Sequence, residues 1–189
     1  MDVRDLARSA RTVRRFRASQ EIPPETLLGI VDAARLAPCG ANLQMLRFVM
    51  LEKPSDRDAL FPLLRWAAYL KNWPGPPESE RPSAYIVILA PVEEKPFTRM
   101  DVGIAAGYMM LAAREQGLGC CMILSFDRQK AAEVLSPPDG LSPILVLALG
   151  YPAEDVVLET LAPGQSVEYW RDPEGRHHVP KRSLEDLIL

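Results

Sequence analysis

The chain has 189 residues, of which 48% are hydrophobic and 25% are charged, so we expect one globular domain and not a disordered chain. A net charge of −3 argues against a nucleic-acid-binding surface, and 18 prolines argue against a helical bundle or coiled coil. The three cysteines fit neither a disulfide framework nor a zinc site, and no apolar run is long enough to span a membrane, so we expect a soluble cytoplasmic protein without a metal.

The first half of the chain predicts several helices and one short strand. Pro24 suits a first helical turn and Pro38 marks the end of the same helix. Pro62 is expected to weaken or kink the helix in which it stands. The Pro-rich stretch 71–83 is expected to be either functional or loosely ordered. The predicted elements are helices at 2–10 and 24–36, a strand at 48–51 and a helix from 55 towards 69.

The second half predicts three strands and the best helix of the chain. Asp101 is expected to cap that helix, whose face of small residues favours close packing within the chain or against a second subunit. Residues 152–182 show no periodic core signal, and we expect them to form a weakly structured tail that ends in a short helix capped by Ser183. The predicted elements are strands at 84–90, 119–124 and 144–149 and helices at 101–116, 127–135 and 184–188, which indicates an α+β or α/β class.

The first candidate for chemistry is the segment Arg11-Thr12-Val13-Arg14-Arg15-Phe16. A hydroxyl between guanidinium groups can bind a phosphate together with backbone N–H groups, because arginine supplies forked donors. A solvated basic face at a helix end would explain the same composition. Lys181 and Arg182 form a second phosphate candidate. The adjacent His177 and His178 cannot easily face one metal, and we expect them to have a structural or solvent role.

Two further stretches could bind a flat ligand. The loop at 37–44 contains small residues that let a backbone approach closely, and Asn42 and Gln44 offer donors and acceptors. Residues 117–127 predict a strand–turn–helix junction, whose backbone N–H groups can bind a heterocycle. Either stretch could also be an ordinary connection. The sequence Gly117-Leu118-Gly119 follows a helix and not a strand, so it is no dinucleotide fingerprint.

Taken in order along the chain, these stretches resemble the FMN-dependent nitroreductase family, and its short members in particular. The motifs that carry the resemblance are Arg-Thr-x-Arg-Arg-Phe, Ala-Pro-Cys-Gly-Ala-Asn-x-Gln, Asp-x-Gly in a helix leading to Gly-Leu-Gly, and a terminal Pro-Lys-Arg-Ser-Leu. The resemblance implies an α+β fold with a mixed central sheet flanked by helices. It implies that residues 1–189 form one FMN-binding domain, with 152–189 as an extension that docks on the partner of an intertwined homodimer.

The resemblance also implies three groups of FMN-binding residues. The first binds the phosphate and ribityl chain, the second is a loop of the other subunit against the flavin ring, and the third reaches the ring through its backbone. These groups are Arg11, Thr12, Arg14, Lys181 and Arg182; Pro38, Cys39, Asn42 and Gln44; and Met122, Ile123, Leu124 and Ser125. The chain departs from the family pattern at Ala10, where an arginine is usual, at Cys39, where serine is common, and at Met45-Leu46, which replace Pro-Trp.

The expected function is that of an FMN-dependent oxidoreductase in which the flavin carries the chemistry and no side chain is catalytic. In a ping-pong sequence, NADH or NADPH would give a hydride to FMN, which would then reduce a small-molecule acceptor: a nitroaromatic, a quinone or an activated alkene. Two alternatives stay open, namely other flavin chemistry, such as oxidative flavin breakdown or dehalogenation, and a non-catalytic flavin-binding protein. Trp73 or a neighbour in the 71–83 loop is predicted to gate substrate size, unless Trp73 only packs in the core or an interface.

Overall fold

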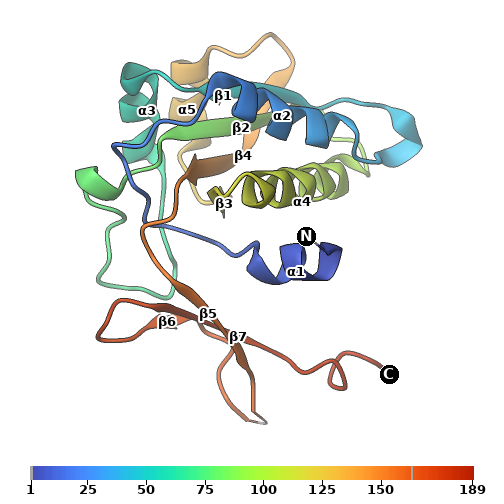
Figure 1. Cartoon of the computed structure of the whole chain (residues 1–189). Coiled ribbons are helices and arrows are strands. Elements are labelled where there is room, and N and C mark those ends of the chain that lie inside the picture. The colour runs from blue at the N-terminus through green and yellow to red at the C-terminus, as the bar shows by residue number, and fades with distance from the viewer. Residues whose placement is uncertain (1, 163) are drawn as a thin grey trace.

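The computed structural model of the chain describes residues 2–162 and 164–189 and consists of an α+β body and a small sheet near the C-terminus (Figure 1). Within the described residues the body holds a four-stranded sheet of order β1-β2-β4-β3, whose neighbouring strands are antiparallel. A parallel bridge between Thr12 and Cys120 adds the N-terminal segment to the β3 edge, so the pairing is mixed, as expected. The strands are β1 (Arg47–Leu51), β2 (Ala84–Pro91), β3 (Gly119–Ile123) and β4 (Leu141–Gly150).

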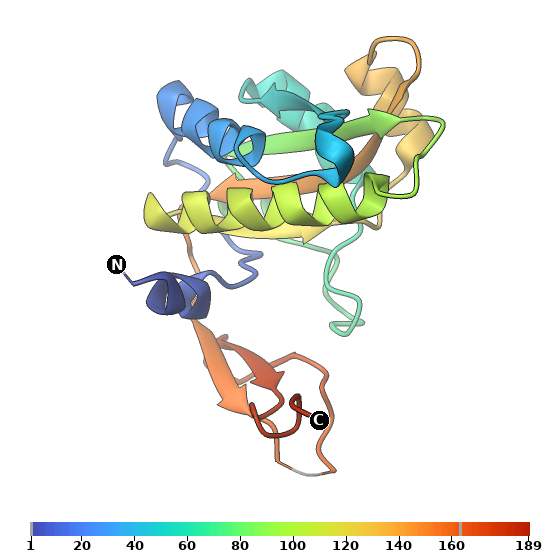
Figure 2. The ribbon, with the colours of Figure 1, turned by 90° about the vertical axis from the view of Figure 1, so that its right-hand side faces the viewer.

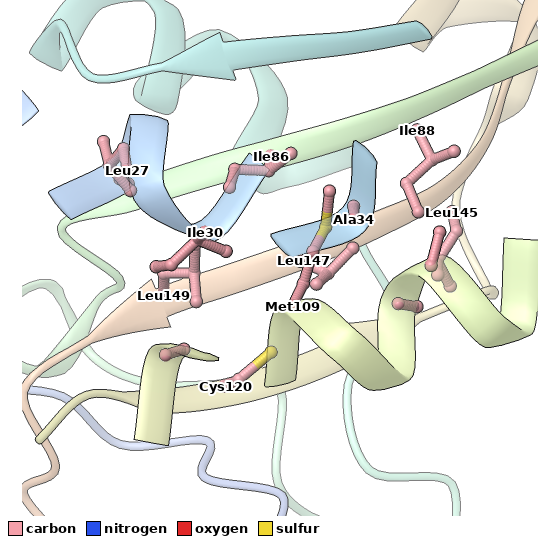
Figure 3. Packing of buried hydrophobic residues seen from close by; sticks show 14 of the residues in the cluster. Leu27, Ile30, Ala34, Ile86, Ile88, Met109, Cys120, Leu145, Leu147 and Leu149 are labelled. Atoms are coloured by element: carbon pink, nitrogen blue, oxygen red, sulfur yellow. The ribbon is translucent and has the colours of Figure 1, made fainter. Parts of the chain in front are cut away.

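Helices cover both faces of this sheet, and β2 and β4 are buried along most of their length, as their continuous apolar sequences indicate. On one face Ile86 and Leu147 pack against α2 (Pro24–Arg35) and α4 (Thr98–Glu115), as Figure 3 shows for the residues around Met109. On the other face Val87 packs in a second cluster with residues of α3 (Pro54–Leu60) and α5 (Arg128–Leu135). None of the helices in the described residues is long and apolar enough to cross a membrane.

Local signals place most helix ends correctly. Asp127 caps α5, because its carboxylate accepts from the backbone N of Lys130 at 3.1 Å. The helix expected to run from 55 towards 69 ends at Leu60, and Pro62 lies in the 3₁₀ turn that follows. The assignment of Asp101 as a cap is wrong, because α4 begins at Thr98 and Asp101 lies inside its first turn.

The C-terminal region is more ordered than its sequence predicts. Its three strands form a small sheet of order β5-β7-β6, in which β5 and β7 are parallel and β6 and β7 antiparallel. These strands are β5 (Val156–Thr160), β6 (Trp170–Arg171) and β7 (His177–Lys181). The sheet lies beside α1 (Val3–Ser9), away from the body (Figure 2). The helix predicted after Ser183 is a turn, in which the Ser183 hydroxyl accepts from the Asp186 backbone N at 3.2 Å.

Candidate functional site

The segment from Arg11 to Phe16 is anchored to the body by two apolar side chains. Val13 is 6% exposed and Phe16 is fully buried. A Cβ at Gly119 would lie 2.7 Å from Val13, and one at Gly150 would lie 2.9 Å from Phe16, so these two glycines permit the close approach. The anchoring fixes the backbone of the whole segment, including its arginines.

Beside this segment lies a cavity of about 210 Å³ that gathers residues from both ends of the chain. The predicted residues Arg11, Thr12 and Arg14 line it together with Lys181, the last residue of β7. Arg182, predicted for the same clamp, is exposed next to Lys181. Tyr169, His177 and Met110 complete most of the remaining wall. The cavity thus joins the two predicted phosphate-binding stretches, although they lie near opposite ends of the chain.

Arg14 is the most buried cation of this cavity, with 9% of its surface exposed. Its Nη1 donates to Nε2 of His177 at 2.9 Å, and its guanidinium carbon lies 4.5 Å from the centroid of the Tyr169 ring. Among the described residues, the Arg14 side chain forms no ion pair with a carboxylate. A buried cation without a carboxylate partner favours an anion beside it, because burial raises the cost of an uncompensated charge.

Glu154, which the sequence did not single out, shapes the backbone of the same segment. Its side chain is 1% exposed, and one oxygen accepts from the backbone N of Arg14 at 2.5 Å and of Arg15 at 3.2 Å. The other oxygen accepts from Nη2 of Arg171 at 2.7 Å. Because Glu154 occupies these two backbone N–H groups, neither of them is free to bind an anion in the cavity.

The two adjacent histidines of β7 point to opposite sides of the strand. The expected structural role fits His178, which stacks on Trp170 and places its ring nitrogens 2.6 Å from Glu159 and 3.0 Å from Asp172. The hydrogen bond to Asp172 raises the pKa of His178. His177 instead lines the cavity, and burial, followed by the nearby charge of Arg14, lowers its pKa to about 4. His177 is therefore neutral at pH 7.

A second cavity, of about 170 Å³, is lined by the predicted residues Pro38, Cys39 and Gln44, while Asn42 is exposed outside its wall. Asp101 also lines this cavity and is 3% exposed, and its carboxylate accepts from the backbone N of Gly40 at 2.8 Å. The Asp101 carboxylate, which the sequence predicted as a helix cap, thus ties the loop to α4.

The third predicted group lies at the end of β3. Ile123 is buried and Met122 is partly buried, whereas Leu124 and Ser125 are exposed. The Ser125 carbonyl accepts from the backbone N of Arg65 at 2.9 Å. In the described part of a single chain, neither of the two cavities contains residues from all three predicted groups.

A larger cavity, of about 730 Å³, contains none of the predicted FMN-binding residues, although Arg15 of the Arg11–Phe16 segment lines it. Its walls carry charges of both signs, and several of these are already paired. Arg15 pairs with Glu80 at 2.5 Å, and Arg176 pairs with Asp172 at 2.6 Å. The paired charges make this cavity a weaker candidate for an anion than the one beside Arg14.

Comparison with known proteins settles the family. The model of the nitroreductase family matches residues 7–151. The chain belongs to the nitroreductase family. This membership confirms the resemblance seen in the motifs, the α+β fold and the expected class of enzyme, an oxidoreductase. The C-terminal sheet, with His177 and Lys181, lies beyond the matched residues, and so does Tyr169.

The relatives carry different names. An iodotyrosine deiodinase from Thermotoga neapolitana is 30% identical over 166 residues, which cover 78% of this chain and 87% of the relative. An NADH dehydrogenase from Thermus thermophilus is 26% identical and covers 90% of this chain and 97% of its own length. A solved FMN-dependent nitroreductase from Clostridium difficile is 28% identical, with a TM-score of 0.63 over 77% of this chain and 84% of the other.

Proposed function

We propose that the protein is an FMN-dependent oxidoreductase that takes electrons from NADH or NADPH and passes them to a small organic acceptor. The observation that carries this proposal is the cavity beside Arg14, where Arg11, Arg14 and Lys181 meet the hydroxyl-bearing Thr12. These four residues fit a phosphate, because they supply three cations and because Arg11 Nε is buried without a hydrogen-bond partner among the described residues.

The residues of the chain would bind and orient the cofactor. When bound, FMN supplies the redox chemistry, as flavins do by exchanging hydrides and electrons with substrates. Arg14, held by His177 and Tyr169, and Lys181 would hold the phosphate. Pro38 and Cys39 would shape the space beside the ring, and the backbone of 122–125 would contact the ring.

The same proposal includes a homodimer. The predicted groups lie apart on one chain, so the loop of a second copy would complete the site. The exposed apolar residues of the C-terminal turn support this proposal, because an apolar cluster at a chain end is a candidate for contact with a partner. These residues are Leu184, Leu187 and Ile188, exposed by 68%, 64% and 66%.

The test is the visible spectrum of the purified protein, before and after incubation with FMN, and then after anaerobic addition of NADH or NADPH. We expect a flavin spectrum that bleaches on addition of one nucleotide and returns when a nitroaromatic or a quinone is added. A protein that stays colourless with FMN would contradict the proposal. A bound flavin that neither nucleotide bleaches would favour the non-catalytic alternative.

A second candidate function is reductive dehalogenation, which the relative named iodotyrosine deiodinase favours. Dehalogenation and nitro reduction can be distinguished by comparing their rates under anaerobic conditions with the same electron donor. Release of iodide from an iodinated phenol, faster than reduction of a nitroaromatic, would favour dehalogenation. The opposite order of rates would favour the nitroreductase activity.

A further inference from the structure

His177 lies at the point where the C-terminal sheet meets the Arg11–Phe16 segment. Its side chain is fully buried, and it lines the cavity together with Arg11, Arg14 and Lys181. Neither the family match, which ends at residue 151, nor the sequence motifs give this residue a role. Its contacts show what it can do there.

The contact with Arg14 fixes the tautomer of the His177 ring. A guanidinium has only donors, so Nε2 of His177, 2.9 Å from Arg14 Nη1, must be the acceptor of that hydrogen bond. A neutral imidazole that accepts at Nε2 carries its proton on Nδ1. Since the low pKa keeps the ring neutral at pH 7, Nδ1 is a donor.

This donor has no hydrogen-bond partner among the described residues, although it is buried. A buried donor left without a partner costs about 1–3 kcal/mol, so most such groups in native proteins have one. The Nε atom of Arg11, which also lines this cavity, is likewise buried without a partner in the described chain. Two such donors at one cavity match a ligand that is rich in acceptors.

The surrounding charges also favour an anion as that ligand. Arg14 and Lys181 line the cavity with His177, and Arg171 adds positive charge that lowers the His177 pKa. The second histidine, His178, faces the other side of β7, where Glu159 and Asp172 hold it. No carboxylate side chain is among the residues that line this cavity in the described structure.

We propose that His177 is a binding residue for the FMN phosphate, with two separate contacts. Nε2 accepts from Arg14 and holds its guanidinium in place, while the Nδ1–H group donates to a phosphate oxygen. This inference rests on the proposed function, because it needs FMN in the cavity. It adds to that function a residue that selects the phosphorylated flavin over the same ring system without phosphate.

The experiment compares the dissociation constants of FMN and riboflavin, which lacks the phosphate, by quenching of flavin fluorescence. For His177→Phe we expect FMN binding to weaken about 10- to 100-fold, as for the loss of hydrogen bonds to a charged group, while riboflavin binding stays within about twofold. His177→Gln, which can still accept from Arg14, should show a smaller loss. The matched control is His178→Gln, on the other face of β7, which should keep the wild-type ratio of the two constants.

The ratio of the dissociation constants of FMN and riboflavin distinguishes a failure of the proposed function from a failure of the role of His177. If the wild-type protein does not bind FMN, the proposed function fails. If the wild type prefers FMN and His177→Phe keeps the same preference, only the role of His177 is wrong. Long-range ¹H–¹⁵N NMR of the wild type is a second readout that needs no variant. It should show His177 protonated at Nδ1, with a shift on adding FMN that riboflavin does not cause, and a proton at Nε2 would overturn the inference.

Discussion

Glu154 shows how a single side chain can set the geometry of a distant segment. Its buried carboxylate accepts from two backbone N–H groups near Arg14 and from the guanidinium of Arg171. The sequence motif revealed the arginines and Thr12, because their chemistry can be recognised from a short stretch. It could not reveal Glu154, Tyr169 or the place of His177, because only the path of the C-terminal chain brings Glu154 to the Arg11–Phe16 segment and the other two residues to the cavity.

The first prediction concerns the free energy of unfolding of Glu154→Gln. The amide keeps the size of the side chain but leaves the charge of Arg171 without its buried partner, and breaking a buried ion pair costs about 3–5 kcal/mol. Urea unfolding measures the change. Glu94→Gln is the control, because Glu94 pairs with Arg99 at an exposed site and its loss should leave stability unchanged. Equal stability of the two variants would contradict the conclusion that the buried ion pair of Glu154 and Arg171 stabilises the fold.

The second prediction concerns the pH dependence of stability. The pKa of His177 is 6.5 for the free side chain and about 4 in the folded protein, so between these values the unfolded chain binds more protons. Stability should therefore fall as the pH drops from about 6.5 towards 4. His177→Phe removes this contribution, while those of His178 and Asp172 remain in both proteins. Urea unfolding at several pH values should show the wild type losing more stability than the variant, and parallel profiles would contradict this.

At the scale of elements, local signals predicted the body well and the C-terminal region poorly. The apolar runs at 84–90 and 144–149 and the start of a helix at Asp127 can be recognised from short stretches, and the structure has β2, β4 and α5 there. The strands β5 to β7 show no comparable pattern in their sequences. They are stabilised by contacts between separate segments, because β5 and β6 both pair with β7 and the His178 ring contacts Glu159 and Asp172. Trp73 packs beside Trp66 and under Arg171, and its gating role stays a prediction.

The third prediction concerns the loop held by Asp101. Asp101→Ala removes the acceptor of the Gly40 N–H, so the loop should open and Cys39 should react faster with a thiol reagent. Only one thiol should react in the native protein, because Cys120 and Cys121 are 2% and 3% exposed and burial raises the pKa of Cys121 to about 11.

The control for this experiment is Asp127→Ala, which removes another aspartate that accepts from a backbone N–H, at the start of α5. It should cost about 1 kcal/mol of stability, as loss of a helix cap does, but leave the labelling rate of Cys39 unchanged. An increase in labelling rate that is the same for both variants would show that Asp101 does not hold the loop specifically.

At the scale of the whole molecule, the predicted site residues occupy separate places on one chain. Arg14 and Lys181 meet in one cavity, Cys39 lines another, and Leu124 is exposed at the end of β3. A sequence can indicate each of these stretches, but the way in which two copies would bring them together depends on surfaces that no local pattern describes. A measurement of mass, which tests the proposed dimer directly, is therefore the most informative experiment at this scale.

The last prediction is that the C-terminal turn holds this dimer together. The wild type should have a mass near twice 21.0 kDa by light scattering, and the triple variant Leu184→Ser, Leu187→Ser and Ile188→Ser should shift towards 21.0 kDa, because it removes the exposed apolar contact. The same variant should bind FMN more weakly, since the second copy no longer completes the site. Val92→Ser, which changes a side chain that is 64% exposed elsewhere, is the control and should keep both properties. A triple variant that remains a dimer with unchanged FMN binding would place the interface elsewhere on the chain.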